Sequence, residues 1–146
     1  MAQVRELDLG DFDAVGVATD IVVALRTHAI EHGVDAAATV SAPSGWQRLV
    51  VTARSSGHVV LGIRYSDLGR SRWNNLADAL ERRGWQLDDD GEGSTRRYPP
   101  GSVPSDAAFE ALSAVTLAGS PTDVRTVDAV DGAGRTVALE PLGRNS

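Results

Sequence analysis

The first pattern in this sequence that could support chemistry is a pair of histidines. His28 and His32 stand four residues apart in a helical pattern, as two metal ligands on one helix face would. Glu31 precedes the second histidine and does not follow the first, so the stretch does not match the zinc-protease motif. No third ligand is evident. We therefore expect an exposed polar helix face and no metal, with a metal site as the alternative.

A run of acidic residues, Asp88-Asp89-Asp90-Gly91-Glu92, could in principle bind calcium. An EF-hand loop needs glycine at position 6 and a bidentate glutamate at position 12. Counted from Asp88, the glycine comes fourth and the twelfth position is Pro99. We expect a solvated hairpin turn, and a weak surface cation site is the alternative.

Nucleophilic catalysis would need a serine beside a base, since the chain has no cysteine. His58 with Ser55 or Ser56 is the candidate pair of base and nucleophile. Neighbouring residues in a tight turn rarely point at each other, however, and no carboxylate that could orient the histidine is evident. The sequence also lacks the Gly-x-Ser-x-Gly elbow, the P-loop and the Gly-x-Gly-x-x-Gly pattern. We expect no catalytic residue, no cofactor and no enzymatic activity.

Composition narrows the classes of partner. The formal net charge is −6 and the isoelectric point is about 4.9, which disfavours nucleic acid because phosphate binding relies on basic side chains. No apolar run approaches the ~20 residues that span a bilayer. The first ten residues lack a signal-peptide pattern, and the absence of cysteine also agrees with a cytoplasmic protein.

All fourteen basic residues are arginine. We attribute this bias to a bacterial genome rich in G and C. The alternative is that arginine serves bidentate recognition of carboxylates. Arg82-Arg83 and Arg96-Arg97 form a local basic cluster beside the acidic loop, which predicts ion pairing within the chain or, alternatively, a docking patch for an acidic partner.

Among the secondary-structure elements that position the candidate residues, the sequence predicts the helix between Trp73 and Trp85 most clearly. Trp73, Leu76, Ala77 and Leu80 share one face of a helix expected over residues 71–83. Gly84 then supplies the left-handed residue of a Schellman stop, after which Trp85 can pack back on Leu80. Both tryptophans are therefore expected to anchor the core and not to contact a ligand.

The remaining elements follow from hydrophobic periodicity and turn residues. The first helix is expected over Asp11–His32, with Gly33 as its stop, and a third from Ser102 or Ser105 to Gly119. Asp106 and Glu110 of the third helix are assigned to its first turn, and its apolar stripe is Ala108, Leu112 and Val115 with Phe109 and Ala111 beside it. Strands are expected over residues 34–40, 46–54, 58–65, 85–88 and 95–98, and a C-terminal hairpin over 124–130 and 135–140.

This order, α-β-β-β-α-β-β-α with an additional C-terminal β-hairpin, predicts an α+β fold in which an antiparallel sheet packs on helices. We expect one domain over residues 1–141 and a disordered tail over residues 142–146. In the first two strands, one face is expected to carry Val34, Ala36, Ala38 and Val40, then Leu49, Val51 and Ala53. In the third strand, Val59, Leu61, Ile63 and Tyr65 are expected to point inward.

Three segments resemble a known class of protein: the hairpin Trp46–Tyr65, the block Trp73–Trp85, and Arg97-Tyr98-Pro99-Pro100-Gly101 before the third helix. With the element order, they resemble the bacterial YbjN and TY-Chap families, which are similar in topology to the small acidic type III secretion chaperones. The resemblance covers about three-quarters of the chain. It implies a non-enzymatic, chaperone-like protein-binding module, commonly a homodimer.

We therefore expect a cytoplasmic adaptor or chaperone-like protein that binds a partner protein through sheet and helix surfaces. The residues expected to contact the partner are exposed members of the strand faces, namely Trp46, Arg48, Arg54 and Arg64. The alternative is a small-ligand-binding or regulatory domain with a pocket between the first helix and the sheet.

Overall fold

The computed structural model describes residues 4–8, 13–41, 48–64, 70–89, 93–118 and 124–139. It confirms the α+β class and the predicted order of elements, and it adds a strand at the N-terminal side. In chain order the elements are β1 (Val4–Asp8), α1 (Ala14–His32), β2 (Ala36–Ser41), β3 (Arg48–Ala53), β4 (Val59–Arg64), α2 (Arg70–Arg82), β5 (Gln86–Leu87), β6 (Gly93–Tyr98), α3 (Pro104–Ala118) and β7 (Val124–Asp131).

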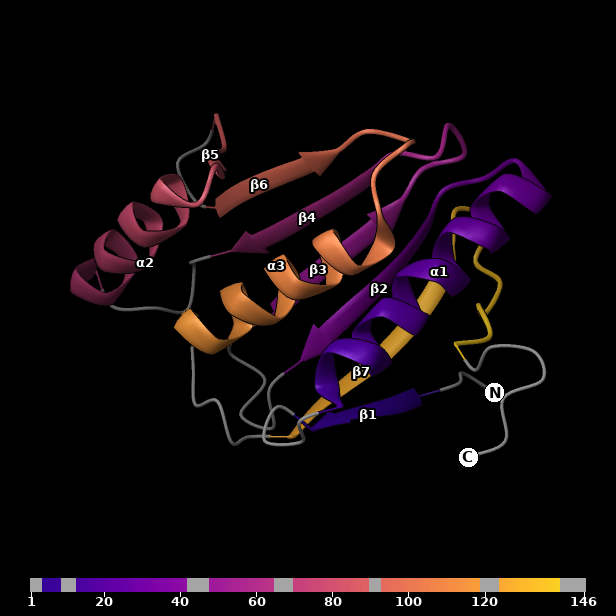
Figure 1. Cartoon of the computed structure of the whole chain (residues 1–146), viewed down its shortest axis with the longest axis horizontal. Helices are drawn as coiled ribbons and strands as arrows, with labels where there is room; N and C mark the ends of the chain where they lie inside the picture. Colours follow the sequence, from indigo (N-terminus) through magenta and orange to yellow (C-terminus); the bar gives the residue numbers. More distant parts are fainter. Residues whose placement is uncertain are drawn as a thin grey trace.

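The strands form one antiparallel sheet in the order β1-β7-β2-β3-β4-β6-β5 (Figure 1). The strands from β2 to β4 follow one another as hairpins, whereas β7 enters between β1 and β2 from the far end of the chain. The sequence did not predict β1, because its partner β7 lies more than a hundred residues away and no local turn pairs them.

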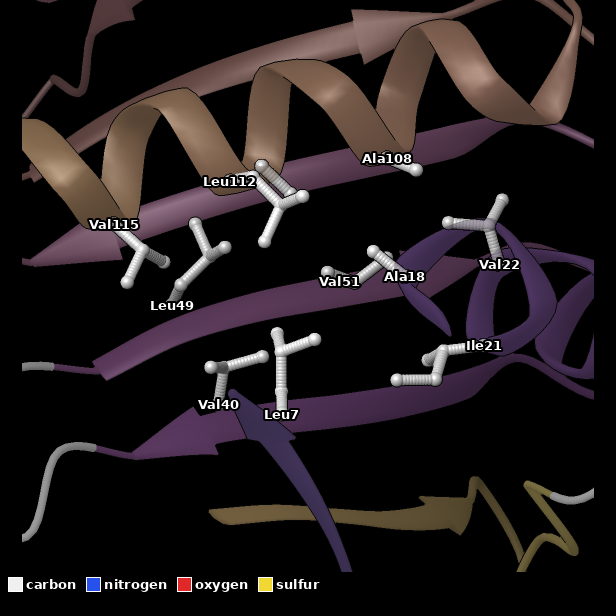
Figure 2. Close-up of a pocket in the computed structure, with 11 residues that line it drawn as sticks. Leu7, Ala18, Ile21, Val22, Val40, Leu49, Val51, Ala108, Leu112 and Val115 are labelled. Carbon is white, nitrogen blue, oxygen red and sulfur yellow. The ribbon is translucent and has the colours of Figure 1, made fainter. Parts of the chain in front are cut away.

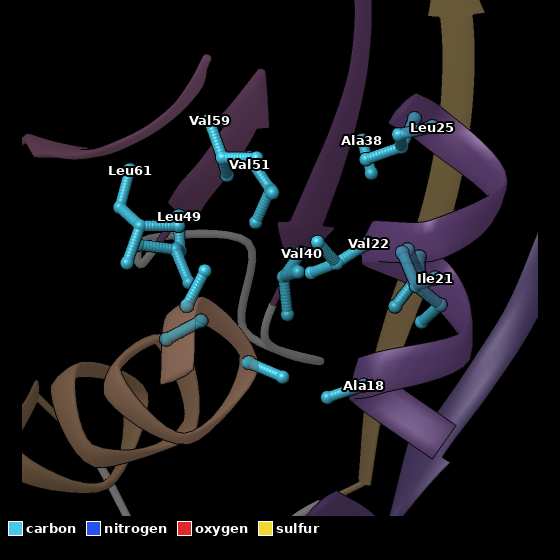
Figure 3. Close-up of a cluster of buried hydrophobic side chains, with 14 of the residues drawn as sticks. Ala18, Ile21, Val22, Leu25, Ala38, Val40, Leu49, Val51, Val59 and Leu61 are labelled. Atoms are coloured by element: carbon cyan, nitrogen blue, oxygen red, sulfur yellow. The ribbon is translucent and has the colours of Figure 1, made fainter. Parts of the chain in front are cut away.

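Helices α1 and α3 lie side by side on one face of the sheet, and α2 packs at the edge formed by β6 and β5 (Figure 1). Most of the strand residues predicted to share the inward faces meet the helices: Ala36, Ala38, Val40, Leu49, Val51, Ala53, Val59, Leu61 and Ile63 are all buried. They meet the buried stripe of α1, which includes Ile21, Val22 and Leu25 (Figure 3). Val34 precedes β2 and is only partly buried, and Tyr65 lies outside the described residues. No helix among the described residues is long and apolar enough to cross a membrane.

The first helix ends where the sequence predicts. Gly33 adopts a left-handed conformation with φ of 64°, which glycine reaches without strain, and the backbone N–H of Val34 bonds to the carbonyl of Ala29. The helix begins at Ala14, three residues later than expected. Residues 11 and 12 of the predicted start lie outside the described part of the chain.

The Schellman stop of α2 is confirmed. The N–H of Trp85 bonds to the carbonyl of Leu80 at 3.0 Å, and the N–H of Gly84 bonds to that of Glu81 at 3.0 Å. Gly84 has φ of 92°, in the left-handed region. Leu80 and Trp85 are buried, and Trp73 packs against the core, so the two tryptophans take part in the core as expected.

Two assignments in α3 are wrong. Glu110 lies beyond the first turn of a helix that begins at Pro104, and it is buried, with only 8% of its surface exposed. Phe109, expected beside the apolar stripe, is 56% exposed, because neighbouring helix positions point about 100° apart and Ala108 already faces the sheet. Ala108 and Val115 are buried as predicted, and Leu112 packs against the core.

The C-terminal hairpin is confirmed in its first arm, β7, and in its turn. Asp131 and Arg135 pair across the turn, and the second arm continues with one bridge between Val130 and Thr136. No further strand forms over residues 137–139, because the edge of β7 over residues 124–128 is already taken by β1. The predicted tail over residues 142–146 lies outside the described residues.

Candidate protein-binding surface

The structure places His28 beside Asp131 of β7 and His32 beside His28. The Nε2 atom of His28 lies 2.8 Å from Oδ2 of Asp131, and the rings of His28 and His32 lie 4.3 Å apart between centroids. No three His, Cys, Asp or Glu side chains of the described residues form a group that could hold a metal ion. His28 is largely buried and therefore does not belong to an exposed polar face, whereas His32 is exposed.

Asp131 is the centre of this cluster. Its Oδ1 accepts the backbone N–H groups of Ala133 and Arg135, and its Oδ2 accepts Nε of Arg135 at 2.9 Å. The hydrogen bond with His28, together with these donors, holds the pKa of Asp131 well below its ordinary value against the opposing effect of burial. The cluster therefore fastens the turn after β7 to helix α1.

Ser56 and His58 do point at each other, contrary to the expectation. Ser56 Oγ lies 2.8 Å from His58 Nδ1 in the exposed turn between β3 and β4. The carboxylate of Asp35 is also at this turn, where it accepts the backbone N–H of Ser55 at 3.0 Å. The contact therefore organises a hairpin turn, and among the described residues no carboxylate is hydrogen-bonded to the His58 ring as a catalytic triad would need.

The acidic loop is only partly described, because residues 90–92 lie outside the described chain. Asp88 accepts a hydrogen bond of 2.6 Å from the Thr95 hydroxyl, and its backbone N–H bonds to the Gly93 carbonyl. Asp88 is thus engaged in closing the β5–β6 turn, as expected for a hairpin.

The four arginines of the basic cluster have two different environments. Arg83 and Arg96 make contacts within the fold, whereas Arg82 and Arg97 are exposed. Glu110 of α3 accepts hydrogen bonds from Arg83 Nε at 2.8 Å and from Trp85 Nε1 at 2.9 Å. Burial opposes ionisation of Glu110, but the bonds from Arg83 and Trp85 outweigh it and lower the pKa of the carboxyl. In the same region Arg96 donates to the Arg83 carbonyl.

Arg96 also lies over the ring of Tyr98, 5.1 Å from its centroid, a cation–π contact. Burial raises the pKa of Tyr98, although the charge of Arg96 opposes the shift. Arg83 and Arg96 therefore serve the packing of α2, β6 and α3. Arg82 and Arg97 are exposed. The sequence missed Glu110 because a single glutamate on a helix carries no sign of burial.

A cavity lies between α1, α3 and the sheet, where the alternative hypothesis expected a pocket (Figure 2). Its volume is about 20 Å³, room for about one water molecule. Its walls are entirely apolar, with Ile21 and Val22 of α1, Val51 of β3 and Leu112 of α3 among them. No polar side chain in this wall could orient a metabolite.

The second face of the sheet, here named the open face, has no described helix on it (Figure 1). Strand residues alternate between the two faces, so those between the inward residues point to the open face. With described side chains, these are Ala37, Thr39 and Ser41 of β2, Arg48, Val50 and Thr52 of β3, Val60, Gly62 and Arg64 of β4, Thr95 and Arg97 of β6, and Thr126, Asp128 and Val130 of β7.

The centre of the open face has no charged side chain. Thr39, Val50, Thr52, Val60 and Gly62 are small or β-branched and each is partly exposed. A Cβ built on Gly62 would meet no atom within 4 Å, which agrees with an uncovered surface. The charged side chains of the open face, Arg48, Arg64, Arg97 and Asp128, lie around this centre.

Three of the four predicted contact residues, Arg48, Arg54 and Arg64, lie at the rim of the open face. Arg48 and Arg64 are exposed, and the register of β3 and β4 puts them side by side at one end. Arg54 is exposed beyond the opposite end of β3, where its Nε lies 3.9 Å from Asp35 Oδ2. Trp46 lies outside the described residues.

No protein-family model, curated protein or solved structure matches this chain.

Proposed function

We propose that this chain is a non-enzymatic protein-binding module whose binding surface is the open face of its sheet. The observation that carries the proposal is the uncharged centre of that face, formed by Thr39, Val50, Thr52, Val60 and Gly62. Interfaces are depleted of charge at their centre and polar at their rim. The arginines at the rim would add orientation and specificity.

The make-up of this surface favours a protein partner over a small molecule. Small ligands bind in concave sites that enclose most of their surface, whereas the centre of the open face consists of short side chains on extended strands. The cavity under α1 supports the alternative, a ligand-binding domain, only weakly, because about 20 Å³ would not admit a metabolite.

Several parts of this proposal rest on the sequence alone. They are membership of the YbjN and TY-Chap type, the cytoplasmic location, the absence of enzymatic activity and the homodimeric state. Each stays a prediction.

A photo-crosslinking experiment tests the proposed surface. A benzophenone amino acid is introduced at Thr52 in the centre of the open face and, as a matched control, at Val23 on the exposed side of α1. Irradiation in a lysate of the source organism should give a protein adduct from position 52. Mass spectrometry identifies the protein that is attached.

Substitution of Val50 by glutamate should abolish the adduct at position 52, because a charge at the centre of an interface must lose its hydration. Adducts from position 23 only, or an adduct at position 52 that Val50→Glu leaves unchanged, would contradict the proposed surface.

A further inference from the structure

We infer that the open face binds an extended, acidic segment of a different protein through two carboxylates. One carboxylate lies between Arg48 and Arg64 at one end of the face, and the other meets Arg97 nearer the opposite end. This proposal rests on the proposed function and states the chemistry of its partner. It follows from the partners of the arginines, from their spacing along the strands and from the open surface at Gly62.

Most arginines with described side chains interact with another group of this chain. They are Arg26, Arg54, Arg64, Arg83, Arg96, Arg125 and Arg135. Arg48, Arg82 and Arg97 differ, because each is exposed and has no hydrogen bond or ion pair among the described residues. In a chain with a net charge of −6, carboxylates are plentiful. Two of these three arginines, Arg48 and Arg97, nevertheless lie on the open face, where a carboxylate from outside can reach them.

Arg48 of β3 and Arg64 of β4 make one end of the open face basic. The register pairs Leu49 with Ile63, so Arg48 and Arg64 form the next pair along these strands and point to the same face. Like charges directly opposite each other on neighbouring strands are destabilising. A carboxylate between them removes this repulsion and offers one oxygen to each guanidinium, a charge-assisted geometry that arginine favours.

Arg97 lies where a second carboxylate of the same segment can reach it. It pairs with Val60, which is four residues from Arg64 in β4. At about 3.3 Å per residue, these two rows of the sheet lie about 13 Å apart along the strands. Alternate side chains of an extended segment face the same side, so its residues i and i+4 match this separation. An α-helix advances about 13 Å in about nine residues, which brings the side chain to its opposite side.

The surface between the two rows is uncharged and open. Gly62 pairs with Val50 of β3 and with Thr95 of β6, and a Cβ built on it would meet no atom within 4 Å. The Thr95 hydroxyl is donated to Asp88. The side chain at position i+2 of the segment therefore lies over Gly62, where an apolar residue can contact Val50. The expected pattern is acidic, any, apolar, any, acidic.

The charge of the whole chain favours carboxylates of a protein over phosphates of a nucleic acid. A net charge of −6 repels a polyanion, whose binding depends on many basic contacts. Single-stranded nucleic acid binds along continuous basic grooves and stacks its bases on aromatic side chains. The described side chains of the open face include no aromatic residue, and its two basic rows are separated by an uncharged centre.

NMR titration of the full chain with a synthetic peptide tests the proposal. The probe is a nine-residue peptide with glutamate at its third and seventh positions, valine at its fifth and threonine elsewhere. We expect it to shift the side-chain Nε–H signals of Arg48 and Arg97 and the backbone N–H signal of Gly62. The variant Arg48→Gln/Arg97→Gln should weaken binding about tenfold, because two charge-assisted contacts are lost. Both positions are exposed, so the fold tolerates the change.

Two controls accompany the titration. Arg82→Gln removes an exposed arginine from α2, outside the open face, and should leave peptide binding unchanged. A second peptide, with its glutamates at the third and sixth positions, presents them on opposite sides of an extended chain and should bind about tenfold more weakly.

The proposal is overturned if the first peptide at millimolar concentration shifts no signal of the open face. It is also overturned if Arg48→Gln/Arg97→Gln binds this peptide as the wild type does, or if the two peptides bind equally well. An oligothymidine that shifts the same signals at lower concentrations than the peptide would assign the arginines to phosphates and would likewise overturn it.

The crosslink at position 52 reports on the proposed function separately. A lysate adduct that Arg48→Gln/Arg97→Gln reduces and Arg82→Gln does not supports both proposals. An adduct that neither variant changes keeps the binding surface and rejects its acidic partner. The absence of any adduct contradicts the proposed function, whereas the peptide titration decides whether the face binds an acidic segment.

Discussion

Glu110 of α3 and Trp85, the residue that follows the stop of α2, share a buried hydrogen bond of 2.9 Å between Oε2 and Nε1. Arg83, two residues before Trp85, adds bonds of 2.8 and 3.2 Å to the same carboxylate. One acidic side chain thus collects three donors from the end of α2. This fixes the position of α2 against α3, although α2 lies at the edge of the sheet.

Removal of this carboxylate should destabilise the fold. Glu110→Ala leaves the Trp85 indole N–H buried without its acceptor, and a cost of about 2–4 kcal/mol in the free energy of unfolding is expected. Glu110→Gln keeps an acceptor and should cost less. Urea denaturation measures both, with Glu81→Ala on the exposed side of α2 as the control. A loss no larger for Glu110→Ala than for Glu81→Ala would refute the role of this contact.

Substitution of Gly84 should cost more than substitution of Gly33, although both residues have left-handed backbones. A Cβ at Gly33, where φ is 64°, meets no atom within 4 Å, so Gly33→Ala should cost only the backbone strain of about 1–2 kcal/mol. A Cβ at Gly84, where φ is 92°, collides with the guanidinium of Arg96. Gly84→Ala should therefore lose more stability in thermal and urea unfolding, and equal losses would show that Arg96 moves aside freely.

Filling the cavity should stabilise the protein. Val51→Ile adds one methylene to a residue that lines the cavity, and about 0.5–1 kcal/mol of stability is expected. Val59→Ile is the matched control, because Val59 is 1% exposed in the adjacent strand and is not part of the cavity wall. The control should overpack the core and destabilise it. The prediction fails if the two variants change the free energy of unfolding in the same direction.

Acid should weaken the fold through Asp131 and Glu110. Both have pKa values below their ordinary ones in the folded chain, so their contribution is present above the ordinary carboxyl pKa of about 4. It is lost as the pH falls from there through the folded pKa values. The free energy of unfolding, measured in urea between pH 7 and pH 2, should therefore decrease.

The double variant Asp131→Asn/Glu110→Gln provides the comparison. It should be less stable than the wild type at pH 7 and should lose less stability on acidification, because the two titrating groups are gone. Asp128→Asn on the open face serves as the control, since Asp128 belongs to neither cluster. Parallel pH profiles for the wild type and the double variant would contradict the assignment.

Local sequence patterns predicted most of the fold because most of its elements are bounded by local chemistry. Gly33 and Gly84 end helices through backbone conformations that glycine favours, and alternation in β3 and β4 identified their inward faces. The pairing of β1 with β7 joins two strands that lie more than a hundred residues apart in the sequence. No turn residue or periodicity can signal such a contact.

The candidate surface could be predicted only in part. Arg48 and Arg64 were expected to be exposed strand residues, and they are. Their common position at the rim of one uncharged face depends on the register of several strands, which the sequence does not specify. The interactions of His28 with Asp131, and of Ser56 with His58, likewise depend on side-chain directions within folded turns.

The position of β7 has a consequence for the newly made chain. Ribosomes synthesise β1 first, yet its partner strand is the last of the sheet to emerge. Until residue 131 has left the ribosome, β2 presents an unpaired edge, and such edges invite association with other chains. The sheet can therefore close only once β7 has emerged, by insertion of β7 between β1 and β2. Until this non-local step is complete, the unpaired edge of β2 can associate with other chains.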